Sequence, residues 1–295
     1  MAIAEINTKI SQHLRSNSLT SAAHPLASQF EEHLHGLKGS EATSSLSSSS
    51  VCHKLNDMLD LHDYTNKLLQ LPIEQQAFAQ ECNDKWVDEL LEGSLRLLDI
   101  CSTAKDCLLQ SKECMHELQS VIRRKRGTET EFVVEGVKYL ALRKKMKKQI
   151  QKGLENLKAM KNELIPSSSI KDNKPSSMLS FLKEAQAITL SSLEQLLLLI
   201  SDSKGHSKHR RWLAISKLMQ PKRAVCNSEE SYTNGFENVD AALQSLISHK
   251  PSYIENFHSH MENLGMCIQD LEIGIEHLSR KLIRNRVSLL NIFNH

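Results

Sequence analysis

Apolar residues recur at alternating steps of three and four along the C-terminal part of the chain, the period of a helix that buries one face. The pattern predicts one long helix over 254–292. Its flanking positions lack the alternating Glu and Lys of a two-stranded coiled coil, so we expect it to pack mainly inside the chain's own bundle. The alternative is a homo-oligomer formed through 254–292. The apolar positions are Ile254, Phe257, Met261, Leu264, Ile268, Leu271, Ile275, Leu278, Leu282, Leu289 and Ile292.

The same period predicts further helices along the chain, and no strand pattern competes with it. Pro72 is expected in the first turn of a short helix. The segment 178–202 is Leu-rich on nearly every face and should be deeply buried. The other predicted helices cover 51–71, 87–122, 131–164, 213–219 and 239–248. In 131–164 the apolar stripe is Val133, Val137, Leu140, Ile150, Leu154, Leu157 and Leu164, interrupted by "RKKMKK" between 142 and 149.

We therefore expect an all-α protein, an elongated bundle of long antiparallel helices with coiled-coil-like packing. Residues 1–50 hold "SEATSSLSSSS" and few periodic apolar positions, so we predict a largely disordered Ser-rich head. Residues 51–295 form the single helical-bundle domain, with loops near 166–177, 203–211 and 221–237. Within the head, Arg15 stands three residues before Ser18, a spacing that makes Ser18 a candidate phosphorylation site.

Cysteine usage and hydropathy indicate an intracellular chain. Seven cysteines are scattered without a CxxC pair, as in a reducing compartment. No secretory apolar core follows Met1, and the longest aliphatic run is the five residues 196–200, far short of a membrane span. The cytoplasm is the first expectation, with the nucleus and, through a transit peptide in the Ser-rich head, the plastid left open.

Cys101, Cys107, Cys114 and His116 lie close together in the sequence and suggest a metal site. On one continuous helix they cannot converge, because zinc needs its ligands within about 2.3 Å of one point. The chain contains no P-loop, dinucleotide-binding glycine pattern, HExxH, GxSxG or EF-hand loop. We expect no catalytic residue, no cofactor and no metal.

Basic clusters are the sequence features that favour binding. Nine Lys or Arg stand against one acid over 138–161, and seven stand against none over 203–228. An anionic membrane surface or another anionic ligand could use them, although a solvated helix face is the simpler explanation. Nucleic acid is not expected, because few aromatic residues lie nearby to stack on bases. The candidate anion-binding residues are Lys144, Lys145, Lys147, Lys148, Arg210 and Arg211.

Several long blocks resemble the plant-specific BYPASS-like family of helical proteins. They include "KWVDELLEGSLRLLDICSTAKDCLLQSKECMHELQSVIRRKRG", "SKLMQPKR" and "LIRNRVSLLNIFN". The resemblance implies a role in root and shoot development, an undefined molecular activity, and no catalytic residues to transfer. Our first hypothesis is a non-enzymatic scaffold or regulatory protein that acts through helix-mediated contacts with protein partners. The alternative is a peripheral binder of anionic membranes or ligands that uses the helix 138–161 and the segment 203–223.

Overall fold

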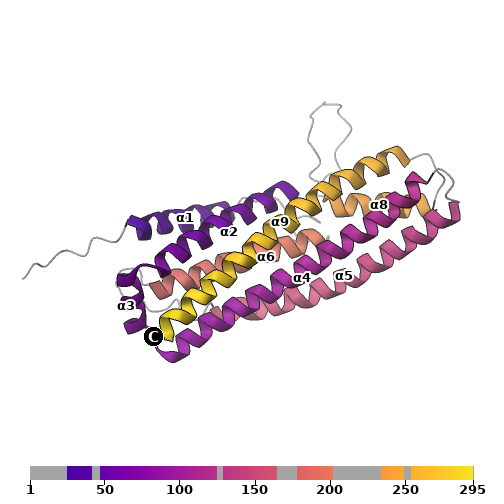
Figure 1. Ribbon diagram of the computed structural model, residues 1–295. Coiled ribbons are helices and arrows are strands. Elements are labelled where there is room, and N and C mark those ends of the chain that lie inside the picture. Colours follow the sequence, from indigo (N-terminus) through magenta and orange to yellow (C-terminus); the bar gives the residue numbers. More distant parts are fainter. Residues whose placement is uncertain are drawn as a thin grey trace, which may run out of the picture.

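The computed structural model describes residues 25–41, 47–124, 129–164, 178–201, 234–248 and 254–294, and its regular structure in these ranges is entirely α-helical. The predicted all-α class is confirmed. Figure 1 shows the longer helices aligned along one axis in an elongated bundle. The helices are α1 (Pro25–Glu41), α2 (Ser48–Leu69), α3 (Pro72–Glu81), α4 (Asp84–Arg123), α5 (Glu129–Leu164), α6 (Met178–Ser201), α8 (Gly235–Ser248) and α9 (Ile254–Phe293).

Five long helices close into a ring in the order α2, α9, α4, α5, α6, with α6 also contacting α4. Helices α2 and α9 run in the same direction, because Leu55 lies against Gly274 while His62, further along α2, bonds Asn285, further along α9. The other neighbours in the ring are antiparallel. An odd number of helices in a ring cannot alternate throughout, so the predicted antiparallel arrangement does not extend to the α2–α9 pair.

The α9 stripe faces the inside of this ring. From Phe257 to Leu278 every residue of the predicted apolar stripe is almost completely buried, and Leu282 and Leu289 follow. At Gly274 an added Cβ would approach Leu55 Cδ1 to 3.1 Å, so a small residue is needed where α2 crosses. The expected packing of this stripe inside the chain's own bundle is therefore confirmed. Helix α6 is buried at most of its positions, as its Leu-rich sequence predicts.

The buried stripe of α5 differs from the predicted one. Val137 is 52% exposed, whereas Tyr139, Arg143 and Met146 are buried and continue the stripe to Ile150. The expected interruption at "RKKMKK" is therefore wrong, since two of its residues face the core. Arg143 can occupy a core position because an acidic residue of α8 neutralises it, as described below.

The predicted disorder of residues 1–50 is wrong for 25–41 and for the first turn of α2. Helix α1 packs on α2 and α6 through Phe30, Leu34 and Leu37, which are spaced to share one face and are buried. The Phe30 and Phe181 rings meet edge to face at 5.3 Å. Helix α2 begins at Ser48, where the Ser47 hydroxyl accepts a hydrogen bond from Ser50 N at 3.2 Å.

Most other helix boundaries agree with the prediction. Pro72 occupies the first turn of α3, and α4 is one continuous helix that begins after the N-cap Asn83. Helix α8 begins at Gly235, so the predicted loop 221–237 extends too far at its end. The loop predictions at 166–177 and 203–211 and the short helix at 213–219 lie outside the described residues.

Candidate functional site: an apolar patch on α4 and α9

Helices α4 and α9 form one outer face of the bundle, and this face carries exposed apolar side chains. Arg286 fixes the two helices side by side, because its Nη1 donates to Leu91 O and, at 2.8 Å, to the Ser94 hydroxyl. Residues of α4 and α9 that lie one helical turn from these contacts are thereby brought close together. We call this cluster the apolar patch; its members are Leu91, Leu95 and Leu98 of α4 and Ile283, Val287 and Leu290 of α9.

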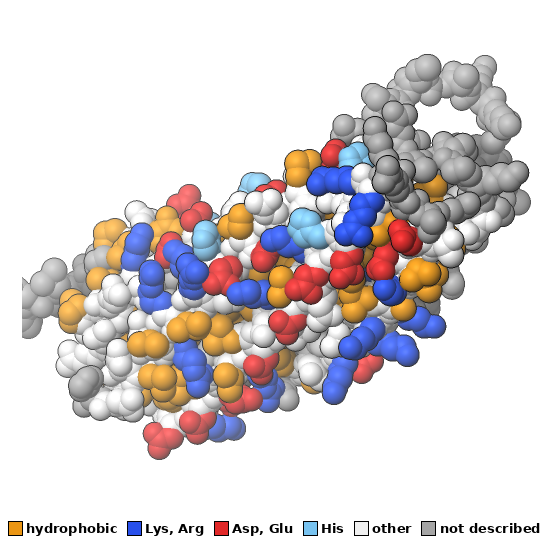
Figure 2. Space-filling model, turned by 45° about the vertical axis from the view of Figure 1, so that its right-hand side comes forward, with side chains coloured by type: hydrophobic (Ala, Val, Ile, Leu, Met, Phe, Trp, Pro, Cys, Tyr) orange, Lys and Arg blue, Asp and Glu red, His pale blue; other side chains and the backbone are white. Residues whose placement is uncertain are grey.

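The apolar patch is open to solvent on both helices. Leu95 is 43% exposed, Ile283 51% and Val287 49%, and the other members are half-buried. Figure 2 shows hydrophobic side chains gathered at its lower left, consistent with the end of the bundle where α4 begins and α9 ends. Two more exposed residues, Met266 and Ile273, continue an outward stripe along α9. Contiguous exposed apolar surface of this kind marks contact sites for other molecules.

Ion pairs link α4 to α9 beyond the apolar patch. Lys112 Nζ lies 2.7 Å from Glu272 Oε2, and Lys105 pairs with Glu276. Charge-assisted bonds from Lys105 and Arg280 hold the pKa of the Glu276 carboxyl below its usual range. The charged part of the face therefore holds α4 and α9 together, whereas the apolar patch exposes hydrophobic side chains.

The residues predicted to bind anions have different environments. Lys144, Lys145 and Lys148 are exposed on α5, whereas Lys147 Nζ lies 3.1 Å from Asp240 Oδ2. Lys147, whose side chain is 38% exposed, thus pairs with Asp240 within the chain, and the anion-binding role predicted for these four lysines stays a prediction. Arg210, Arg211 and Ser18 lie outside the described residues.

Asp240 belongs to a buried charged cluster that joins α5, α6 and α8. Arg143 Nε lies 3.2 Å from Asp240 Oδ1, and its Nη1 donates to Ile200 O at 2.9 Å, at the C-terminus of α6. The guanidinium also covers the Phe236 ring at 4.7 Å. Burial, and then the Asp240 charge, raise the pKa of Tyr139 next to this cluster. These contacts fix the position of α8.

A second buried polar cluster joins α2, α6 and α9. The Thr189 hydroxyl donates to Ala185 O at 2.7 Å, so it can only accept from His62 Nε2 at 3.0 Å. Asn285 Nδ2 lies 3.0 Å from His62 Nδ1 and donates to it. His62 is therefore the neutral Nε2–H tautomer, and burial lowers its pKa to about 4. Its hydrogen bonds are structural and leave no ring nitrogen free for chemistry.

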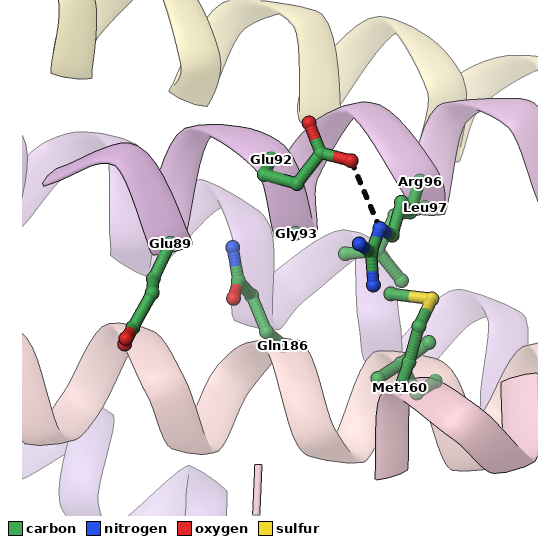
Figure 3. A pocket seen from close by; sticks show the side chains of 8 residues that line it. Glu89, Glu92, Gly93, Arg96, Leu97, Met160 and Gln186 are labelled. Carbon is green, nitrogen blue, oxygen red and sulfur yellow. Dashed lines mark hydrogen bonds and ion pairs between the residues drawn. The ribbon is translucent and has the colours of Figure 1, made fainter. Parts of the chain in front are cut away.

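A cavity of about 290 Å³ lies between α4, α5 and α6. Figure 3 shows Gln186 of α6 reaching toward Gly93 of α4, with Met160 of α5 beside them. A side chain at position 93 would occupy the place of the Gln186 amide, because an added Cβ would lie 2.7 Å from its Oε1. At the mouth, Glu92 and Arg96 form an ion pair at 2.9 Å. The lining contains neither a histidine nor a hydroxyl or thiol nucleophile.

The cysteines of α4 behave as small core residues. Cys101 and Cys107 are buried, and burial raises the pKa of Cys101 to about 12 and that of Cys107 to about 11. Among the described residues, no group of three or more His, Cys, Asp or Glu side chains is arranged to hold a metal ion. Nor does any helix in the described ranges combine the length and apolarity needed to cross a membrane.

A family model described as Protein BPS1 matches residues 54–292. The chain belongs to this family. The match agrees with the resemblance carried by the quoted sequence blocks. A search of curated proteins and a search of solved structures each found no match.

The matched region of this BPS1 family chain contains the whole of the apolar patch and both buried polar clusters, whereas α1 lies before it. The sequence analysis did not single out the patch. Its available signal was a second set of apolar residues on α9, Met266, Ile273, Ile283 and Val287, outside the buried stripe. That signal could not show that Leu95 of α4 lies beside them, because the register of the two helices depends on the fold.

Proposed function

We propose that this chain is a non-enzymatic scaffold or regulatory protein in plant root and shoot development that binds protein partners through the apolar patch. The developmental role rests on the family resemblance. The interaction role rests on one observation, the grouping of exposed Leu95, Ile283 and Val287 beside ion pairs that link α4 to α9. Removing such a group of apolar side chains from water is favourable in free energy. The side-chain ridges of two neighbouring helices can also accommodate a third helix between them.

The partner that we infer for the apolar patch is an amphipathic helix. A helix laid between α4 and α9 would contact residues one turn apart on each, such as Leu91 and Leu95, and Ile283 and Val287. Burial contributes about 25 cal/mol for each Å² of apolar surface removed from water, so a few such side chains can supply the centre of an interface.

The test compares two variants of the full chain in affinity purification from plant tissue with quantitative mass spectrometry. The patch variant carries Leu95→Gln, Ile283→Gln and Val287→Gln. The control carries Ile73→Gln, Leu109→Gln and Met266→Gln, which change apolar residues outside the patch that are 80%, 43% and 60% exposed. We expect one or more partners to be depleted at least about tenfold by the patch variant alone, the effect of losing about 1.4 kcal/mol.

Circular dichroism and thermal unfolding of both variants establish that they fold. Loss of the same partners in both variants, or retention of all partners in the patch variant, would refute the role of the patch. Candidate partners that pass this comparison are then tested as purified proteins, which separates direct binding from shared membership of a larger complex.

A further inference from the structure

The outward side of α5 combines exposed apolar side chains with exposed lysines. We call it the outer face of α5. Two exposed valines lie toward its N-terminal end, Val134 at 48% and Val137 at 52% exposure. A group of exposed lysines follows, with small Ala141 between. The lysines of the outer face are Lys144, Lys145, Lys148 and Lys152.

Helix geometry puts these side chains on one surface. At 100° per residue the four lysines fall within an arc of about 100°, and Val134 and Val137 fall within the same arc. The rise of 1.5 Å per residue spreads the lysines over about 12 Å of helix, with the valines extending the surface toward α8. Figure 2 shows Lys and Arg side chains gathered at its lower right, the side on which α5 lies in Figure 1.

None of the four lysines has an acidic partner among the described residues, a feature that they share with Lys67, Lys85 and Lys158. Elsewhere on the same helix, Lys147 pairs with Asp240 and Lys161 with Glu194. The one exposed acid beyond them on this face is Glu155, which accepts a hydrogen bond from Gln151 Nε2 at 3.3 Å. Since each lysine is left uncompensated, the outer face of α5 carries a concentrated positive charge.

We propose that the outer face of α5 docks on the surface of an anionic lipid bilayer. Lysine ammonium groups bind lipid phosphates and carboxylates as point charges, and exposed valines alongside them can enter the headgroup region. A nucleic acid would use the lysines but leave the valines in water, and the nearby aromatic residue, Tyr139, is buried and cannot stack on a base. The helix lies along the membrane surface and does not cross it.

The predicted strength follows from the number of lysines. Each Lys close to an anionic membrane raises the partition coefficient about fivefold, so four contribute a factor of several hundred. The attraction weakens as salt shortens the screening length from about 10 Å at 0.1 M to about 3 Å at 1 M. Binding is therefore expected to be strong at low salt and largely lost at high salt.

The experiment is co-sedimentation of the full chain with phosphatidylcholine vesicles, with and without phosphatidylserine. The test variant replaces all four lysines with Gln. The matched control makes the same charge change at four exposed cations elsewhere, Lys67, Lys85, Arg123 and Arg284. We expect binding to need phosphatidylserine, to fall more than a hundredfold in the test variant, and to change less than about tenfold in the control.

A second variant, Val134→Ser with Val137→Ser, keeps every charge and tests the apolar contribution. We expect it to bind the anionic vesicles several-fold more weakly than the wild type, because two side chains no longer enter the headgroup region. Both variants should unfold at the wild-type temperature, since the replaced side chains are exposed.

Three results would overturn the proposal. The first is absence of wild-type binding to phosphatidylserine vesicles at low salt. The second is equal loss in the test variant and the control, which would reflect net charge alone. The third is lysine-dependent binding to a duplex RNA or DNA probe that vesicles cannot compete away and that the valine variant retains, which would assign the face to nucleic acid. None of these results bears on the apolar patch of α4 and α9, which is tested separately.

Discussion

Protonation of His62 should make the protein lose stability in mild acid. The ring is buried between Thr189 and Asn285 as a neutral group, and its pKa falls from the ordinary 6.5 to about 4. Between these two values the unfolded chain binds a proton that the folded protein does not. Stability is therefore fully present above about pH 6.5 and is lost as the pH falls toward 4.

The size of the effect follows from the two pKa values. One pKa unit is worth about 1.4 kcal/mol, so the whole interval corresponds to roughly 3 kcal/mol. Between about pH 7 and pH 5 the linkage relation gives a loss of about 2 kcal/mol from this one group. A protonated Nδ1 would point its hydrogen at the Asn285 amide, which is a donor, unless that amide turns to present its oxygen.

The assay is urea unfolding followed by far-ultraviolet circular dichroism at the two pH values, for the wild type and His62→Gln. Other titrating groups act equally in both proteins, so they cancel in the difference. We expect the wild type to lose about 2 kcal/mol more than the variant between pH 7 and pH 5. Equal losses in the two proteins, or a midpoint near 6.5 for His62 in an NMR titration, would refute the neutral buried imidazole.

Three further predictions concern the two buried polar clusters and the glycines at positions 93 and 36. Asn285→Asp puts a carboxylate beside His62, so the His62 pKa should rise and the variant should gain stability relative to wild type as pH falls, measured by the same urea series. Asp240→Asn leaves the buried Arg143 unneutralised and should cost about 3–5 kcal/mol, whereas Asp240→Leu combined with Arg143→Met should recover most of this in thermal unfolding. Gly93→Ala should cost up to about 1 kcal/mol, because its Cβ would displace the Gln186 amide and break the 2.8 Å bond from its Nε2 to Leu90 O. Gly36→Ala, with open space around it, should stabilise α1 by about 0.5–1 kcal/mol. Equal effects of the two glycine changes would contradict the packing at Gly93.

Hydrophobic periodicity correctly predicted those stretches of helix whose buried positions are all occupied by apolar residues. The α9 stripe is the clearest case, since Leu264, Ile268 and Leu271 are apolar and all are buried. The same reasoning failed at Arg143, which occupies a stripe position between Tyr139 and Met146. A buried charge is tolerated only with a partner, and that partner, Asp240, is 97 residues away along the chain.

The surroundings of the predicted binding residues likewise depend on a partner that is distant in the sequence. The sequence placed Lys147 with Lys144, Lys145 and Lys148 because all four are basic and adjacent. The fold separates them, since Lys147 pairs with Asp240 whereas the other three lie further around α5, where no acidic partner among the described residues meets them. Disorder of the segment around Phe30 was predicted from its Ser-rich surroundings, whereas the short apolar stripe of α1 is enough to pack on two helices.

The two buried polar clusters explain how helices with repetitive apolar stripes keep one register. Leucine and isoleucine stripes can slide by a heptad at modest cost, because one apolar contact replaces another. A slide of α9 would separate Asn285 from His62, and a shift of α8 would leave Arg143 without Asp240. Each would bury an unsatisfied polar group or charge, which costs far more than a changed apolar contact. The clusters lie toward opposite ends of the bundle and each joins three helices, so together they fix the alignment of α9 with α2 and α6 and of α8 with α5 and α6. Arg286 separately holds α4 against α9 through Leu91 O and the Ser94 hydroxyl, and this register places Leu95 on the same outer face as Ile283 and Val287.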